Sequence, residues 1–226
     1  SWVFLRSAIG EGRAPPLGGA TARLLTLAEE GDATFAARCA EDRRHLAAIR
    51  AAREDAAEHY FARHAAEWDQ LRSLHSPDGP VEAALLAALG KANLGALLDI
   101  GTGTGRIAEL LSPCAARVAG LDNSPEMLRL ALTRLQHLPA QSLELVQGDF
   151  AALPFADASF DTVVFHQVLH YAQEPLLALT EAARVCRAGA TIAVVDFAAH
   201  DREELRERHA HARPGIREAP MLERLT

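Results

Sequence analysis

The sequence predicts an α/β fold in which a parallel sheet is covered by helices on both faces and preceded by a helical N-terminal segment. Two observations carry this prediction. The stretch LLDIGTGTGR, residues 97–106, passes from an apolar run into three glycines at alternate positions and then into a helical pattern. From residue 81 onward, short apolar runs alternate with segments whose apolar residues recur every three or four positions. Such alternation gives a parallel sheet that binds ligands at the carboxyl ends of its strands.

The alternation defines strands and helices from residue 81 to residue 195. Pro113 should end one helix, and Ser124 followed by Pro125 is typical of the start of another. We expect strands at 96–100, 118–121, 143–146, 162–165 and 191–195, and helices at 81–89, 107–111, 127–135 and 175–187.

The first 78 residues have a different pattern. Residues 2–6 resemble a strand with no partner before it, and residues 20–30 suggest a helix. From residue 42 to 75, apolar residues recur at helical spacing with charges on the other faces, which predicts one long helix or two in line. Residues 76–79, Ser-Pro-Asp-Gly, should break this helix. The predicted units are therefore 1–30, a helical connector at 31–78 and a main domain at 79–226.

The glycine-rich turn is a candidate ligand site. Glycines at 101, 103 and 105 allow positive φ angles and let a ligand lie against the bare main chain, next to the free N–H groups of the new helix. Asp122 ends the next predicted strand, where a carboxylate can accept bonds from the two hydroxyls of a ribose. The alternative is an ordinary turn between a strand and a helix.

At this point the sequence resembles the class I S-adenosylmethionine-dependent methyltransferases, whose first motif is the acid plus G-x-G-x-G pattern found here as Asp99 to Gly105. The resemblance implies a Rossmann-like methyltransferase domain, S-adenosyl-L-methionine as cofactor and S-adenosyl-L-homocysteine as product. It also implies that a zwitterionic amino-acid tail, and not a pyrophosphate, lies near the loop. The cofactor contacts it implies are Tyr60, Trp68, Asp99, Gly101, Thr102, Gly103, Gly105, Asp122, Asn123, Met127, Gly148, Asp149, Phe150 and His166.

The resemblance also assigns roles at the later strand ends. Asp149 would accept a bond from the adenine amino group, and the N–H of Phe150 would meet a ring nitrogen; alternatively, Asp149 only caps a turn. His166 would lie beside the methionine part of the cofactor, and His170 or Tyr171 would face the methyl acceptor. These last three are the predicted catalytic residues.

Two further residues are candidates for a part in catalysis. His200 is another candidate base, and Asp196 and Tyr171 are candidate orienting groups. A general base is needed only if the acceptor must lose a proton, because methyl transfer from a sulfonium depends mainly on positioning. A histidine at such a place is also commonly a packing or hydrogen-bonding group.

An aromatic cluster in the connector suggests a lid. Tyr60, Phe61, Trp68 and Arg72 recur on one helical face, and methyltransferases of the resembled class often lay an N-terminal helix over the bound cofactor. The simpler interpretation is an amphipathic connector that packs on the main domain or on a partner subunit. The two interpretations are compatible.

The layout from Trp2 to His211 resembles a bacterial family that joins an ArsR-type winged helix to a methyltransferase. Residues 2–6 would be a wing strand, and residues 20–30 the dimer-forming helix. The resemblance implies transcription regulation, a homodimer, and DNA contact through a winged helix upstream of Ser1. The resembled methyltransferase fold has seven strands and only five are apparent in this sequence, so we expect that the C-terminal strands are missing or, alternatively, that the domain is unusually short.

Composition limits the other possibilities. A net charge of −7 argues against a large nucleic-acid surface on the residues present. The apolar runs are too short to cross a bilayer and no signal-peptide layout is present, which favours a cytoplasmic location without membrane contact. Cys39, Cys114 and Cys186 are widely spaced and fall in helical patterns, and His209 and His211 are too close to be two ligands on one helix face, so no metal site is predicted.

Two functions remain open on the sequence. The first is an enzyme that methylates a small molecule; the second is a non-catalytic sensor of S-adenosylmethionine or S-adenosylhomocysteine that controls DNA binding. The sensor needs only the cofactor pocket. The enzyme also needs an open acceptor pocket beside it.

Overall fold

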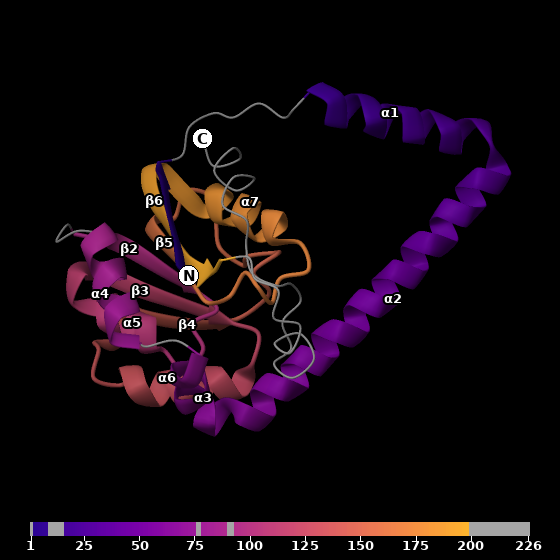
Figure 1. Cartoon of the computed structure of the whole chain (residues 1–226). Helices are drawn as coiled ribbons and strands as arrows, with labels where there is room; N and C mark the ends of the chain where they lie inside the picture. The colour runs from indigo at the N-terminus through magenta and orange to yellow at the C-terminus, as the bar shows by residue number, and fades with distance from the viewer. Residues whose placement is uncertain (1, 9–15, 76–77, 90–92, 199–226) are drawn as a thin grey trace.

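Six strands form one sheet through the centre of the main domain (Figure 1). The computed structural model describes residues 2–8, 16–75, 78–89 and 93–198. The strands are β1 Trp2–Ala8, β2 Gly95–Ile100, β3 Ala115–Asp122, β4 Leu143–Gln147, β5 Phe160–His166 and β6 Cys186–Phe197. Strands β2 to β6 are parallel in the order β6-β5-β2-β3-β4, which confirms the predicted sheet. The segment 199–226, where the prediction of missing strands falls, lies outside the described residues.

Helices cover both faces of this sheet, as predicted: α4 Asp78–Leu89, α5 Arg106–Leu111, α6 Pro125–Leu135 and α7 Pro175–Val185. The cap of α6 is also confirmed, since the Ser124 hydroxyl accepts the Met127 amide at 3.3 Å. The predicted break at residues 76–79 is partly wrong, because Asp78 and Gly79 form the first turn of α4. Pro80 does not interrupt this helix, since a proline in the first turn displaces no intrahelical hydrogen bond.

Successive residues of the central strands point into two hydrophobic layers, one on each face of the sheet. Leu98 and Phe165 belong to the layer that contains α7, whereas Leu97 and Val164 belong to the layer that contains α4 and α5. All four side chains are fully buried. Because both faces are covered, the central strands are continuous apolar runs and not alternating ones.

The first strand has a partner that the sequence pattern did not reveal. β1 pairs antiparallel with β6, from Trp2 opposite Phe197 to Ala8 opposite Thr191. The expectation of a strand without a partner is therefore corrected. An edge strand leaves a row of backbone N–H and C=O groups unpaired, and β1 satisfies those of β6. This pairing makes β1 part of the main sheet.

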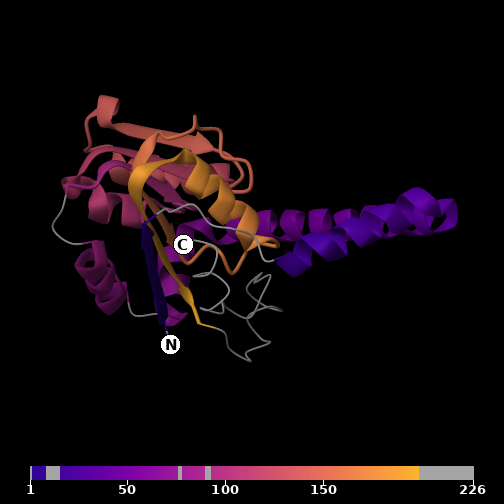
Figure 2. The ribbon, with the colours of Figure 1, turned by 90° about the horizontal axis from the view of Figure 1, so that it is seen from above.

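Two long helices extend from the domain as an arm (Figures 1 and 2). α1 Pro16–Gly31 and α2 Ala33–His64 meet at Asp32, whose side chain caps α2 by accepting the backbone amides of residues 34 and 35. Glu29 and Arg43 join the two helices through an ion pair of 2.8 Å.

The arm returns to the domain through a short 3-10 turn, Ala65–Glu67, and α3 Trp68–His75. Residues 42–75 therefore form the end of one helix and a second, shorter helix, separated by this turn. Among the described residues, none of the helices combines the length and the apolar character needed to cross a membrane.

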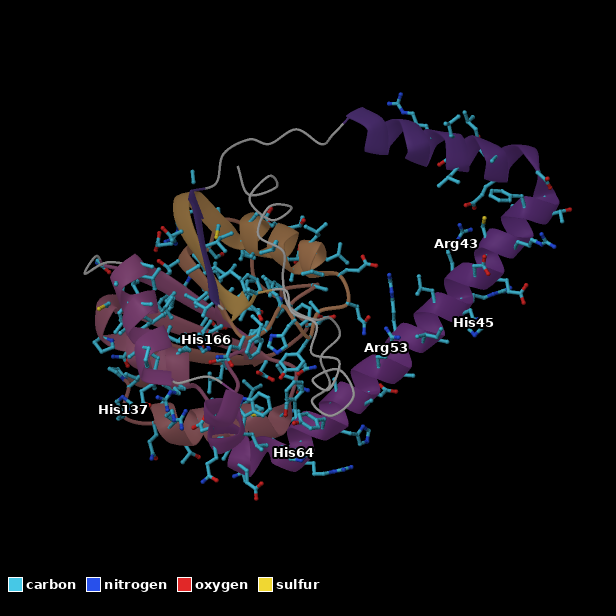
Figure 3. The ribbon with its side chains drawn as sticks, viewed as in Figure 1. Arg43, His45, Arg53, His64, His137 and His166 are labelled. Carbon is cyan, nitrogen blue, oxygen red and sulfur yellow. The ribbon has the colours of Figure 1, made fainter. Side chains whose placement is uncertain are left out.

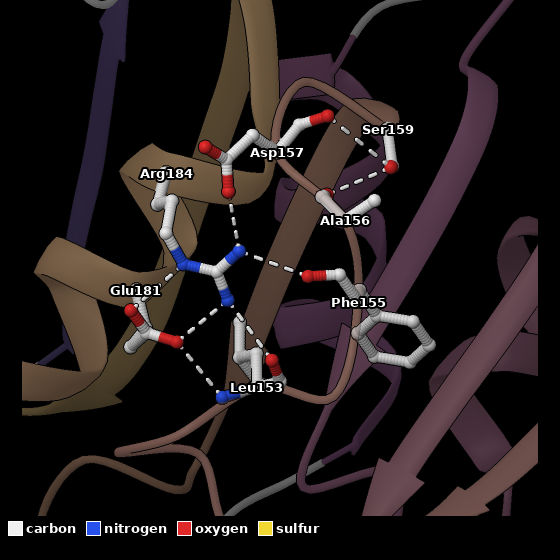
Figure 4. A network of polar contacts seen from close by, with 7 residues as sticks. All are labelled: Leu153, Phe155, Ala156, Asp157, Ser159, Glu181 and Arg184. Carbon is white, nitrogen blue, oxygen red and sulfur yellow. Dashed lines mark hydrogen bonds and ion pairs between the residues drawn. The ribbon is translucent and has the colours of Figure 1, made fainter.

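Arg184 of α7 holds the loop between β4 and β5 against the domain (Figure 4). Its guanidinium donates to the backbone oxygens of Leu153 and Phe155 at 2.9 Å and pairs with Asp157 and Glu181 at 2.7 Å. Glu181 also accepts the Leu153 amide at 2.9 Å. The loop begins at the carboxyl end of β4, so this network fixes a segment that leads away from the ligand-binding edge of the sheet.

We expect Arg184→Met to lower the free energy of unfolding by about 1–3 kcal/mol, because two backbone carbonyls and two carboxylates lose their donor. Arg187→Met is the matched control, since Arg187 makes one exposed ion pair, with Asp161, and should cost less than about 1 kcal/mol. Urea denaturation of both variants measures the difference. Equal losses would show that the Arg184 network contributes no more than a surface pair.

Candidate functional site

The glycine-rich loop is tied to the end of the neighbouring strand by backbone hydrogen bonds. The amides of Gly101 and Thr102 both donate to the oxygen of Leu121, at 2.8 and 2.9 Å. Asp99, at the end of β2, is almost completely buried and accepts the Thr102 hydroxyl at 2.8 Å. Gly101 has a φ of 69°, in the left-handed region. These bonds hold the loop open, with its backbone facing a cavity.

Asp122 lies at the carboxyl end of β3, beside this loop. One of its carboxylate oxygens accepts the Gly103 amide at 2.8 Å, and the other accepts the Ser124 amide at 2.9 Å. Burial raises the pKa of Asp122 above its ordinary value, although the backbone donors partly oppose the shift. Each oxygen keeps a second lone pair, so the carboxylate can still accept bonds from a diol.

A cavity of about 850 Å³ opens at the carboxyl ends of the strands. This volume lies in the upper part of the range for small-molecule sites. Ten of the predicted cofactor residues line it, which brings together segments far apart in the sequence: Tyr60, Trp68, Gly101, Gly103, Asp122, Asn123, Met127, Gly148, Asp149 and Phe150.

Four predicted cofactor residues lie elsewhere. Asp99, Thr102 and His166 line a second cavity of about 30 Å³ on the other side of the glycine loop, room for about one water molecule. His166 is buried in the domain interior (Figure 3) and does not line the main cavity, and its place beside the methionine part of the cofactor stays a prediction. Gly105 lines neither cavity, because it begins α5 and packs against Ala131.

Two roles were predicted for Asp149, capping a turn and binding adenine, and its position is compatible with both. Its side chain caps the following turn by accepting the Ala151 amide at 2.8 Å. It also lines the main cavity together with Phe150, which is half-buried and packs against the core. The turn cap orients the carboxylate, and adenine recognition by Asp149 stays a prediction.

Aromatic side chains from two distant segments meet over the cavity. Phe61 of α2 contacts Trp68 of α3 and Tyr171 of the loop after β5, with ring centroids 5.1 and 4.8 Å apart. Tyr60 contacts both Phe61 and Trp68. All four rings line the cavity. The predicted lid cluster is thus assembled, except that the side chain of Arg72 lies outside the described part of the structure.

A polar cluster ties α3 to the glycine loop beneath this aromatic cover. Asp69, next to Trp68, accepts the hydroxyl of Thr104 at 2.8 Å and forms an ion pair with Arg134 of α6. Arg134 also donates to the Thr104 hydroxyl at 2.9 Å. The helix that covers the cavity and the loop that forms its floor therefore share one hydrogen-bonded cluster.

Of the three predicted catalytic residues, only Tyr171 lines the main cavity. Of the two alternatives for the acceptor side, His170 does not line the cavity: it is 1% exposed, and its Nδ1 lies 2.6 Å from Asp196 Oδ1. The His170 ring packs behind Tyr171 at a centroid distance of 4.0 Å. Burial, with Tyr60 and Asp196 nearby, raises the pKa of Tyr171 well above its ordinary value.

Tyr171 is therefore protonated at neutral pH and can orient an acceptor by hydrogen bonding, but it cannot act as a base in that form. Asp196 contacts His170, and its predicted role as an orienting group in catalysis stays a prediction. His200, His209 and His211 lie outside the described residues.

The structure adds cavity residues that sequence reasoning missed. Gln167 and Val168 follow β5 directly, so their position at a strand end was the available signal. Arg50 and Arg53 of α2 and Leu177 of α7 also line the cavity (Arg53 is labelled in Figure 3). Their sequence context gave no signal, because only the fold brings α2 and α7 to the strand ends.

The cysteines and the metal prediction add little to this site. Cys186 begins β6 and is buried, so its assignment to a helical pattern was wrong; burial raises the pKa of its thiol to about 12. Within the described ranges, no group of three or more His, Cys, Asp or Glu side chains is placed to hold a metal ion.

Comparisons with known proteins agree with this geometry. Residues 98–194 match the family model described as a methyltransferase domain. The chain is 38% identical over 112 residues to a phosphatidylethanolamine N-methyltransferase of Cereibacter sphaeroides, covering 49% of this chain and 55% of the relative. It is 38% identical over 108 residues to the 2-phytyl-1,4-beta-naphthoquinone methyltransferase of Arabidopsis thaliana, covering 45% and 41%.

Solved structures show the same fold. The YcgJ protein of Bacillus subtilis matches with a TM-score of 0.52 and 27% identity, over 59% of this chain and 61% of that one. Phosphoethanolamine N-methyltransferase 1 of Haemonchus contortus matches with a TM-score of 0.58 and 20% identity, over 66% and 33%. The chain spans about half or less of the length of the curated relatives it matches.

Gly101 gives a direct test of how closely the loop is packed. A Cβ atom at this position would lie 2.4 Å from a γ-carbon of Val168, so Gly101→Ala should displace the loop or the β5 end and cost about 2–4 kcal/mol of stability. Gly189→Ala is the matched control, because its φ of 79° is similar but nothing lies within 4 Å. Its cost should be only the left-handed backbone term, about 1–2 kcal/mol. Chemical denaturation that gives equal losses for both variants would contradict this packing.

Proposed function

We propose that this chain acts as an S-adenosylmethionine-dependent methyltransferase on a small-molecule acceptor. The single observation that carries the proposal is one continuous cavity at the strand ends, which joins the glycine loop and Asp122 to a half lined by Tyr171 and Leu177. The first half suits a nucleoside with an amino-acid tail. The second half leaves room for a second molecule. The volume of the whole cavity, about 850 Å³, therefore favours the enzyme over a sensor that needs the cofactor alone.

Different residues of the cavity would bind different parts of the cofactor. Asp122 would hold the ribose hydroxyls, Asp149 and Phe150 the adenine, and the glycine loop the amino-acid tail. When bound, the cofactor would supply an electrophilic methyl group to a lone pair of the acceptor, and its sulfur would keep the electron pair of the former bond. The chain contributes alignment and exclusion of water.

The aromatic cluster Tyr60, Phe61, Trp68 and Tyr171 would cover the reacting groups. Such rings exclude water from a sulfonium and can stabilise its charge through their faces. We include in the proposal the predicted role of the C-terminal part of α2 as a lid. Its contacts with Tyr171 and the link from Asp69 to the glycine loop support this role.

The acceptor class is supported by the relatives. Those compared above are named for methylating a phospholipid amine and a naphthoquinone, which are small molecules with apolar parts. Phe61, Tyr171 and Leu177 would contact such apolar parts, while Arg50 and Glu174 also line the cavity.

The ArsR-type fusion, DNA contact and homodimer form a finer part of the proposal. Leu24, Leu25 and Leu27 of α1 are more than half exposed, which suits a helix that packs against a second subunit. The pairing of β1 with β6 favours a place for β1 in the methyltransferase sheet over a wing strand.

Isothermal titration with S-adenosylmethionine and S-adenosylhomocysteine tests the cofactor site, and Asp122→Asn tests its ribose contact. We expect this variant to bind about 10- to 100-fold more weakly, because a charge-assisted acceptor becomes neutral. Asp161→Asn is the control, since Asp161 also accepts a backbone amide but lies at the opposite end of the sheet. Binding of neither ligand would overturn the proposed function, and unchanged affinity in Asp122→Asn would overturn the ribose contact.

The pH dependence of cofactor affinity is a second test of the contact between Asp122 and the ribose. Binding favours the charged carboxylate, so wild-type affinity should fall as pH decreases through the raised pKa of Asp122, at a higher pH than for an aspartate with the ordinary value of 3.8. Asp122→Asn should lack this decline.

Hydrogen-exchange mass spectrometry with and without S-adenosylhomocysteine tests the lid. Ligand should slow amide exchange from His59 to Leu71, since closure of the aromatic cluster stabilises this helical segment. The outer part of α2, around Arg43, serves as an internal control and should not change. Protection confined to the glycine loop and the turns at Asp122 and Asp149 would leave the helix as a plain connector.

A further inference from the structure

Gln167 is a buried polar residue that the fold does not satisfy. It is the first residue after β5, is 9% exposed and lines the main cavity. Its side-chain Nε2 is buried and has no hydrogen-bond partner among the residues that the structure describes. An amide left in this state costs stability, so such a group in a folded protein calls for a functional explanation.

The backbone of Gln167 is strained as well. Its φ is 58°, in the left-handed region that a glutamine seldom adopts. The conformation is enforced from both sides: the Gln167 amide donates to the oxygen of Val195 at 2.6 Å, and the next residue, Val168, packs tightly against Gly101. Strain of this kind persists where the surrounding structure imposes it, commonly at functional sites.

The position of Gln167 indicates which part of the cavity it serves. Val168, its neighbour, packs against the cofactor loop, whereas Tyr171, four residues further along, begins the acceptor half. Phe61 and Leu177 also line the cavity, together with charged side chains such as Arg50 and Glu174. Gln167 thus places an unsatisfied amide between the glycine loop and Tyr171.

We propose that the Gln167 side chain hydrogen-bonds the methyl acceptor and orients it toward the cofactor. The acceptor is then a small molecule that has an apolar part to contact Phe61, Tyr171 and Leu177 and an oxygen or nitrogen able to form this bond. The inference rests on the proposed methyltransferase function and names its substrate class. A carboxamide can donate through Nε2 or accept through Oε1, so the bond can be made to a carbonyl, a hydroxyl or an amine.

This arrangement would also give specificity. A site whose buried polar group is paired only when the correct ligand is present rejects an analogue without that group, because the amide then stays unsatisfied. Apolar contact alone discriminates much less.

A matched pair of probes tests this, 1-naphthol and 1-methylnaphthalene, which differ by a hydroxyl in place of a methyl group. Saturation-transfer NMR, with S-adenosylhomocysteine present, compares their binding to the wild type and to Gln167→Met, which keeps the length of the side chain without its amide. The wild type should bind 1-naphthol about 5- to 10-fold more tightly than 1-methylnaphthalene. Gln167→Met should bind the two probes equally.

Calorimetry and thermal unfolding distinguish the possible failures. Gln167→Met should bind S-adenosylhomocysteine with wild-type affinity and raise the unliganded Tm by about 2–4 °C, because an unsatisfied buried amide is removed. Gln136→Met, at the exposed end of α6, is the control and should change neither Tm nor probe preference. If Gln167→Met does not fold, Gln167→Leu serves the same comparison.

The inference is overturned if the wild type binds neither probe, if it shows no preference for 1-naphthol, or if the variant retains that preference. A large fall in Tm together with lost S-adenosylhomocysteine binding would make Gln167 a structural residue and also overturn it. Wild-type protein that does not bind S-adenosylhomocysteine would instead contradict the proposed function itself.

Discussion

The hydrogen bonds between the glycine loop and the end of β3 are the constraint on which the site depends. Leu121 accepts two amides of the loop, and Asp122 accepts a third from Gly103. These bonds connect the end of β2 with the end of β3, and they leave the free backbone of the loop facing the cavity. Without them, the loop would have to satisfy its own amides, as buried backbone groups must, and its glycines would lose the open conformation that a ligand can approach.

The parts of the fold that local chemistry determines were predictable from the sequence. Continuous apolar runs gave the five parallel strands, and the Ser124-Pro125 pair gave the start of α6, because capping and burial act within a few residues. The pairing of β1 with β6 was not predictable, since it joins segments almost 190 residues apart with no local signal of register. The start of α4 was misjudged for a related reason: glycine and proline break a helix interior but are tolerated in its first turn.

The difference between local and long-range interactions also explains which site residues could be predicted from the sequence. Glycines 101 and 103, Asp122 and Asp149 line one cavity because each lies at or just after the end of a strand, and parallel strands end at the same edge. His170 also follows a strand, yet it is buried against Asp196, a residue 26 positions later on β6. Whether a residue in a loop faces a ligand or the core depends on such long-range partners. Gln167 is the opposite case, a cavity residue that the sequence did not indicate. Its positive φ and its unsatisfied amide are apparent only in the structure.

The hydrogen-bonded connection between α3 and the glycine loop couples the movements of these two elements. Asp69 lies beside Trp68 on α3, and its carboxylate is shared by Thr104 of the glycine loop and Arg134 of α6. Any shift of the loop on ligand binding would therefore act directly on the helix that carries the aromatic ring. The cluster is partly exposed, so its ion pair contributes little to global stability. Its effect lies in coupling: ordering of the loop and closure of the cover stabilise each other, because both depend on the same three side chains.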